Sequence, residues 1–334
     1  MKRLLAFFLV LGLLAGCGPQ LEKYPRVESS SQGLETQTLT IDIPQEADQL
    51  TLDAVSQLAA ALLELSGGAI TLEVYPSRDP ARALRTGDTH LALLDNSGLM
   101  AADPSLSFLD WPFLMEDEEQ WLTIMGAEDG VVRGSASLRE ALNGEVIGLW
   151  YQGRTVLLGR GSFYEEIGFA GAPLGVLEGR EAPGFFQGIG DLNPKTVSTG
   201  DGETLLKLLS SREVKYIEYP LGKVDPDTLP ELVKHLEDTA HRVEGSWLVL
   251  GKGAVDQKTA QIIRAAAAAV PQPAWNARAR REEELFQALE AREITVQKRP
   301  CPPLRRAAKE YFRKNGKGLG CRESTLERLI ELVS

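Results

Sequence analysis

Apolar and polar residues follow two different spacings in the first part of the chain, and these spacings predict alternating strands and helices. A strict alternation predicts a strand, whereas apolar residues that recur every three to four positions predict a helix. The first predicted helix stops at Gly67-Gly68, a typical helix end. The predicted elements are strands at residues 39–43, 70–76 and 91–94 and helices at residues 50–65 and 82–86. This order is typical of a parallel sheet that is covered by helices.

A polar segment, Asp95-Asn96-Ser97, directly follows the third predicted strand. In α/β sheets of this kind, ligands bind beyond the carboxyl ends of the strands. Asp95 and Asn96 are therefore candidate ligand-binding residues at the edge of a cleft. The alternative is that the segment only turns the chain.

The remainder of the chain continues the mixed pattern, apart from residues 161–200, which are rich in glycine and show few periodic runs. Further strands are predicted at residues 145–150, 214–219, 247–250 and 294–296, and further helices at residues 119–125, 204–209, 257–270 and 275–290. Beyond Pro300 the pattern predicts two more helices, at residues 304–312 and 326–333. These last helices could pack on the body of the protein or bind a partner, and packing on the body is the simpler interpretation.

The amino terminus has the pattern of an export signal. Lys2 and Arg3 precede an apolar stretch of about ten residues, which is the length of a signal-peptide core and too short to span a bilayer. The stretch ends in Leu14-Ala15-Gly16-Cys17, which resembles the lipobox of bacterial lipoproteins, where the cysteine is lipidated after cleavage. The alternative is an ordinary secretory signal with a cysteine at this place by chance.

The lipobox resemblance implies a signal peptide at residues 1–16 and an acyl anchor at Cys17 in the lipid bilayer. The polar residues up to 37, which include prolines and a serine run, then form a tether. The protein is expected in the cell envelope, facing the periplasm or the cell exterior. Gly18 is not the aspartate that retains many lipoproteins at an inner membrane, so outer-membrane placement is open.

Composition and charge narrow the class of protein. The chain of 334 residues is long enough for two domains, and its 43% hydrophobic and 25% charged residues are typical of globular proteins. The net charge of −11 argues against nucleic-acid binding, which needs a basic surface. An anionic ligand stays compatible with this charge, because one buried arginine can bind it locally.

Cysteines, histidines and motifs give no sign of catalysis. Cys301 and Cys321 are predicted to form a disulfide, since the compartment is oxidising, with two free thiols as the alternative. The three histidines are scattered, so no metal site is expected. The nucleophile-elbow, zinc-protease and phosphate-loop motifs are all missing. The sequence therefore favours a binding protein without a cofactor over an enzyme.

Local matches over residues 38–299 resemble the solute-binding proteins of tripartite ATP-independent periplasmic (TRAP) transporters. The matches are a helix end, double glycine and strand at residues 65–77, "l..G.vDm" at residues 84–92, "lPFlf" at residues 109–115, "w..G.R" at residues 150–154, and "e...al..G.vDg.enp" at residues 203–220. In the second match, His90 stands where the family has aspartate. The order and spacing of these segments carry the resemblance, since each is weak alone.

The resemblance implies a two-domain α/β fold of the periplasmic-binding-protein type with a hinged cleft. Domain I would comprise residues 38–150 and about 221–250, and domain II residues 151–220 and about 251–299, followed by a helical tail at residues 300–334 that exceeds what the fold needs. The implied function is capture of a small organic acid, which is handed to the permease subunits of a TRAP transporter.

The resemblance also implies a ligand site. A family arginine clamps the ligand carboxylate, which its planar fork matches. Arg180 lies one place later than this arginine, and a one-residue slip on a strand turns a side chain to the opposite face. Arg154 matches a second family arginine, and Tyr219 stands where the family has a ligand-contacting asparagine. These departures leave open a second hypothesis, an envelope scaffold that has lost or changed its small-molecule ligand.

Overall fold

The computed structural model describes residues 34–163, 173–177, 185 and 195–333. Its elements are β1 (Gln37–Pro44), α1 (Gln49–Leu65), β2 (Ile70–Ser77), α2 (Pro80–Thr86), β3 (Leu91–Leu94), α3 (Asn96–Ala102), η1 (Pro104–Asp110), α4 (Glu118–Gly126), α5 (Ala136–Leu142), β4 (Gly144–Gly159), β5 (Pro173–Leu177), β6 (Lys195–Thr199), α7 (Gly202–Ser210), β7 (Tyr216–Pro220), η3 (Leu221–Lys223), β8 (His235–Gly251), α8 (Gln257–Ala268), α9 (Pro271–Ala291), β9 (Thr295–Lys298), α10 (Pro302–Asn315) and α11 (Glu323–Leu332).

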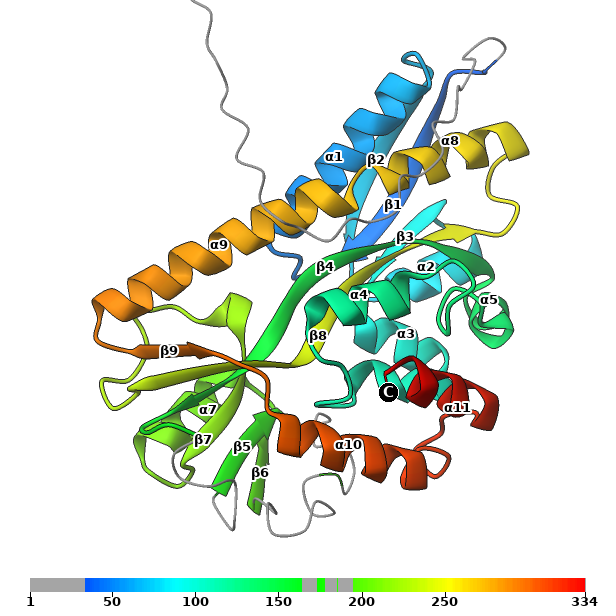
Figure 1. The fold of residues 1–334 in the computed structure, drawn as a ribbon. Coiled ribbons are helices and arrows are strands. Elements are labelled where there is room, and N and C mark those ends of the chain that lie inside the picture. The colour runs from blue at the N-terminus through cyan, green and yellow to red at the C-terminus, as the bar shows by residue number, and fades with distance from the viewer. Residues whose placement is uncertain (1–33, 164–172, 178–184, 186–194, 334) are drawn as a thin grey trace, which may run out of the picture.

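One continuous mixed sheet runs through the molecule, in the order β2-β1-β3-β8-β4-β7-β5-β6, with β9 paired to β8. Strand β1 pairs in parallel with β2 and β3, as the sequence pattern predicts. At the other end of the sheet, β5 pairs in parallel with β6 and β7. We call β1–β3 with their helices the first lobe, and β5–β7 with α7 and β9 the second lobe (Figure 1). The fold is the two-lobed α/β architecture that the sequence predicts.

Aspartates begin many of the helices. The carboxylates of Asp48, Asp79, Asp201 and Asp256 each accept a backbone N–H from the first turn of α1, α2, α7 and α8, respectively. An aspartate at this position satisfies one of the free N–H groups that every helix start exposes. Local sequence therefore fixes where the helices begin and how the loops after the strands are ordered.

Two long antiparallel strands connect the lobes. Strand β4 has 16 residues and β8 has 17, and the ladder between them shifts register at three places. The last shift is the largest, because the ladder passes from the pair Thr155–Arg242 to the pair Leu157–Glu237. Residues 238–241 of β8 therefore loop out opposite Val156, and we call them the β8 bulge. The long helix α9 runs alongside these crossing strands and spans both lobes (Figure 1).

Three apolar clusters form the interior of the described part of the chain. One lies in the first lobe under α1 and α8, and one lies in the second lobe under α7 and the end of α9. The third combines residues of both lobes with those of α10 and α11. The carboxyl-terminal helices therefore pack on the body, as the simpler interpretation predicted.

The predicted disulfide is wrong, because Cys301 and Cys321 are both buried free thiols. Cys301 immediately precedes α10, whereas the backbone N–H of Cys321 bonds to the carbonyl of Gly316, just beyond the other end of this helix. The 14 residues of α10 separate the two ends by about 21 Å. A disulfide needs Cα atoms within about 7 Å of each other.

Candidate functional site

The two lobes meet at the β8 bulge, where the backbone adopts an unusual conformation. Ala240 in the bulge has φ of +47° and Phe113, which faces it, has φ of +60°. The backbone N–H of Phe113 donates to the carbonyl of His241 over 2.8 Å. Left-handed conformations cost energy for residues other than glycine, and they concentrate at functional sites and hinges. This strain marks the bulge as the candidate functional site.

On one side of the bulge, Arg154 of β4 is held by carboxylates of the protein itself. Its guanidinium contacts both carboxylate oxygens of Asp238, with the shortest distance 2.7 Å, and Glu282 of α9 at 2.7 Å. A third carboxylate, Glu118 at the start of α4, lies 3.3 Å away, and the Tyr151 hydroxyl lies at 2.7 Å. All but Glu118 are buried. Charge-assisted bonds of this kind are strong and directional.

Burial raises the pKa of two members of this network. Burial raises the pKa of the Glu282 carboxyl above its ordinary range, and the Arg154 charge and the Tyr151 hydrogen bond oppose this only in part. Burial also raises the pKa of Tyr151 well above its ordinary value. The Tyr151 hydroxyl therefore stays protonated and donates a hydrogen bond to the Glu282 carboxylate over 2.9 Å.

On the other side of the bulge, a second chain of polar groups joins the lobes. Arg242 pairs with Asp110 of the first lobe at 2.8 Å and lies 3.5 Å from Glu218 of the second lobe. The other oxygen of Glu218 lies 3.1 Å from Nε2 of His241, and Nδ1 of His241 lies 2.7 Å from the hydroxyl of Thr239. Arg242, Glu218 and His241 are all at most 3% exposed.

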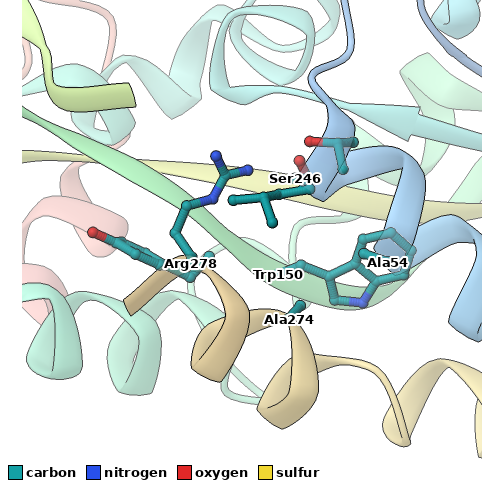
Figure 2. Close-up of a pocket in the computed structure, with 8 residues that line it drawn as sticks. Ala54, Trp150, Ser246, Ala274 and Arg278 are labelled. Atoms are coloured by element: carbon teal, nitrogen blue, oxygen red, sulfur yellow. The ribbon is translucent and has the colours of Figure 1, made fainter. Parts of the chain in front are cut away.

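Among the described residues, two pockets lie where the crossing strands meet the first lobe, and both are small. One is lined by residues of α1, α9 and the crossing strands, and Figure 2 shows the Arg278 side chain beside Trp150 and Ser246 there. The guanidinium of Arg278 is paired with Asp48, the residue that caps α1. The second pocket lies against His241 and Arg242. Each offers about 10 Å³, room for about one water molecule.

Comparison with known proteins identifies the family. A family model described as "Bacterial extracellular solute-binding protein, family 7" matches residues 44–317. The chain belongs to this family. Family 7 comprises the solute-binding proteins of TRAP transporters. The match includes all of α10 and ends before α11, whereas the resemblance read from the sequence ended at residue 299. No curated protein matches the sequence.

Solved structures of TRAP solute-binding proteins share the fold. The protein from Rhodobacter sphaeroides, in an apo open form, has a TM-score of 0.77 at 16% identity, with 89% of this chain and 98% of that chain covered. The sugar acid binding protein from Advenella mimigardefordensis, with galactonate, has a TM-score of 0.66 at 16% identity, covering 90% and 98%. The protein from Haemophilus influenzae, with L-gulonate, has a TM-score of 0.65 at 13% identity, covering 89% and 98%.

The structure places the predicted site residues in different surroundings. Arg154 lies at the junction of the lobes, as expected, but with partners inside the chain. Asp95 caps α3, and the buried Asn96 bonds to the Val243 carbonyl and the Trp247 indole, so Asp95 orders a helix start and Asn96 ties α3 to β8. Tyr219 packs in the apolar cluster of the second lobe. Cys17 and Arg180 lie outside the described residues.

Sequence reasoning missed several residues at the junction. Glu218, next to Tyr219 on β7, has its carboxylate on His241 and close to Arg242, whereas the Tyr219 ring packs in the second-lobe cluster. Neighbours on a strand point to opposite faces, so Glu218, and not Tyr219, faces the junction. Asp238, Arg242 and Glu282 carried no motif in the sequence.

Two further findings concern the described residues. None of the helices in the described parts of the chain is both long and apolar enough to cross a membrane. The same residues contain no group of three or more histidine, cysteine, aspartate or glutamate side chains arranged to hold a metal ion.

Proposed function

We propose that this chain is a lipid-anchored, extracytoplasmic solute-binding protein that captures a small organic acid for the permease subunits of a TRAP transporter. The observation that carries the proposal is the family 7 match over residues 44–317. The anchor is proposed from Leu14-Ala15-Gly16-Cys17, which follows an apolar run of signal-peptide length.

The ligand class is supported by the relatives and by the charges at the junction. Two of the solved structures hold sugar acids, galactonate and L-gulonate. Arg154 and Arg242 provide two buried guanidinium groups where the lobes meet, and guanidinium matches a carboxylate in shape and charge. Because Glu218 belongs to the second lobe, it leaves Arg242 when the lobes separate. We propose that the ligand carboxylate then replaces the Glu218 carboxylate beside Arg242 as the lobes close again.

A second function is favoured by a separate observation. Both arginines already have carboxylate partners within the chain, and the two pockets hold about one water each. A binding-protein fold whose buried junction arginines are paired with carboxylates of the same chain suits an envelope scaffold or interaction protein. The two functions differ in one respect that is measurable, which is whether the protein takes up an acid.

Native mass spectrometry of freshly isolated protein, followed by calorimetry with galactonate and L-gulonate, tests the transport function. Galactitol serves as the uncharged control ligand, and Arg281→Met, an exposed position on α9, as the control variant. Arg242→Met should weaken acid binding by about thirtyfold or more, because losing a partner of a buried charge costs about 2–5 kcal/mol. Protein that carries no acid and gives no heat with either acid would favour the scaffold.

The anchor is tested separately with Cys17→Ala. The parent should fractionate with membranes and carry the added mass of acyl chains, whereas the variant should be released or left unprocessed. A variant that fractionates and migrates like the parent would exclude lipidation at this cysteine.

A further inference from the structure

Helix α10 connects the two lobes through a single buried face. Leu304, Ala308 and Phe312, each four residues apart, are at most 1% exposed. They belong to the one apolar cluster that contains residues of both lobes, such as Leu99 of the first and Val176 of the second. Figure 1 shows α10 running from the side of β5 and β6 toward the turn that leads into α11. The helix therefore lies across the junction instead of within one lobe.

The Phe312 ring lies between one aromatic ring from each side. It stacks on Trp111, which follows η1 in the first lobe, with ring centroids 4.3 Å apart and planes 4° apart. It also stacks on Phe185, in the segment between β5 and β6, at 5.3 Å and 9°. Tyr311 contacts the same Phe185 ring edge-on at 5.6 Å. We call the space between Trp111 and Phe185 the Phe312 slot.

The stack continues to the β8 bulge. Phe185 lies 6.3 Å from Phe113, and Phe113 stacks on His241 at 4.8 Å. Phe113 is also the strained residue whose N–H bonds to the His241 carbonyl. The rings of the first lobe, the second lobe, α10 and the crossing strand β8 thus form one continuous series of contacts. Aromatic pairs in these geometries contribute beyond the area that they bury.

The end of α10 is fitted closely to the first lobe. A Cβ atom on Gly316 would lie 2.8 Å from Cη2 of Trp111 and 2.8 Å from Cδ1 of Leu326. Only glycine allows this approach, which keeps α10 against Trp111 and holds Phe312 in its slot.

We propose that α10 is an interlobe strap, and that opening of the junction requires the Phe312 ring to leave its slot between Trp111 and Phe185. Separation of the lobes moves Trp111 and Phe185 apart, so one face of Phe312 must lose its partner. Without the ring, the closed arrangement loses the stabilisation that the two stacks give it relative to the open one. The closed-to-open ratio then falls by about tenfold or more. This inference does not depend on which ligand the protein binds.

Small-angle X-ray scattering of Phe312→Ala and Phe286→Ala tests the strap. Phe286 is a matched control, since it is a buried phenylalanine on α9 that packs in the cluster of the second lobe alone. Both variants should have a lower melting temperature than the parent. For Phe312→Ala we expect the radius of gyration to rise by about 1 Å or more above the roughly 19 Å of a compact chain of about 300 residues. Phe286→Ala should stay at the parent value.

A milder variant keeps the test decisive if Phe312→Ala does not fold. Phe312→Leu retains an apolar side chain but loses both stacks, and it should expand the protein in the same direction by a smaller amount. Expansion that is specific to the Phe312 variants supports the strap. A folded Phe312 variant with the parent's radius of gyration would overturn it, and so would equal expansion in Phe286→Ala.

Discussion

Two buried arginines lie on neighbouring strands at the junction of the lobes, and they differ in where their partners come from. The main partners of Arg154 are Asp238 on β8 and Glu282 on α9, both on elements that connect the lobes. The partners of Arg242 are Asp110 of the first lobe and Glu218 of the second. Two arginines that are both buried therefore have different structural roles.

This difference shows how a hinge can be rigid and still allow the lobes to move. The two shortest ion pairs of Arg154, with Asp238 and Glu282, stay within the crossing elements, so they persist when the lobes separate, whereas the longer contact with Glu118 of α4 does not have to. The contacts of Arg242 reach into both lobes, so at least one of them must break on opening. We infer that Arg154 braces the hinge, whereas Arg242 and the α10 strap hold the closed arrangement.

The largest effect is expected from Arg154→Met. The variant leaves Asp238 and Glu282 buried without their cation, and breaking a buried ion pair from one side costs about 3–5 kcal/mol. Urea unfolding of the variant, the parent and the exposed control Arg281→Met measures this directly, and the control should stay within about 0.5 kcal/mol of the parent. A change in Arg154→Met as small as in the control would show that the network does not brace the hinge.

Arg242→Met should destabilise the protein somewhat less, by about 2–4 kcal/mol, because Asp110 is partly exposed and regains water. The buried carboxylate that loses this nearby cation is Glu218. Adding Glu218→Gln should therefore recover part of the lost free energy of unfolding, which a double-mutant cycle measures. Additive losses in the double variant would mean that the two side chains do not interact.

Gly316→Ala examines the fit of the end of α10 against Trp111 of the first lobe and Leu326 of α11. Its Cβ atom would meet Trp111 and Leu326 at 2.8 Å, and overpacking of this kind costs about 1–3 kcal/mol. Gly222→Ala is the control, because the nearest atom to its Cβ would lie 4.0 Å away. Thermal unfolding should show a lower melting temperature for Gly316→Ala alone, and equal melting temperatures for both would contradict the close fit of α10.

The smallest effect concerns pH. Since burial raises the pKa of Glu282, the folded protein holds this proton more tightly than the unfolded chain, whose ordinary value is 4.5. The resulting stabilisation is present at low pH and is lost as pH rises through the raised value. Between about pH 5 and about pH 8, the free energy of unfolding should therefore decrease more in the parent than in Glu282→Gln. Parallel profiles would exclude Glu282 as the source.

Much of the fold could be predicted from the sequence, because the outer elements have clear periodicity. Strand β3 was predicted with its observed bounds, and α1, β2 and α8 within a few residues. The crossing strands were predicted too short, at residues 145–150 and 247–250. Their missing halves carry Arg154 and the segment from His235 to Arg242, where charged residues are buried in ion pairs and so hide the apolar pattern of a strand.

The site was less predictable than the fold, because its residues come from distant parts of the chain. Arg154 was found through the family pattern, but its partners lie 84 and 128 positions away. Asn96 has the polar character of a cleft residue, yet its side-chain amide is already hydrogen-bonded to Val243 and Trp247. A sequence shows which side chains can pair, and only the fold decides which of them meet.

The most direct test of the two arginine roles is the distance between the lobes in solution. Spin labels on Ser56→Cys of α1 and Ser210→Cys of α7, both exposed, report this distance in protein with Cys17→Ala. The buried thiols of Cys301 and Cys321 stay unlabelled, since burial raises the pKa of both, and that of Cys321 to about 11. We predict a longer distance in Arg242→Met and the parent distance in Arg154→Met. A longer distance in Arg154→Met with no change in Arg242→Met would contradict the account.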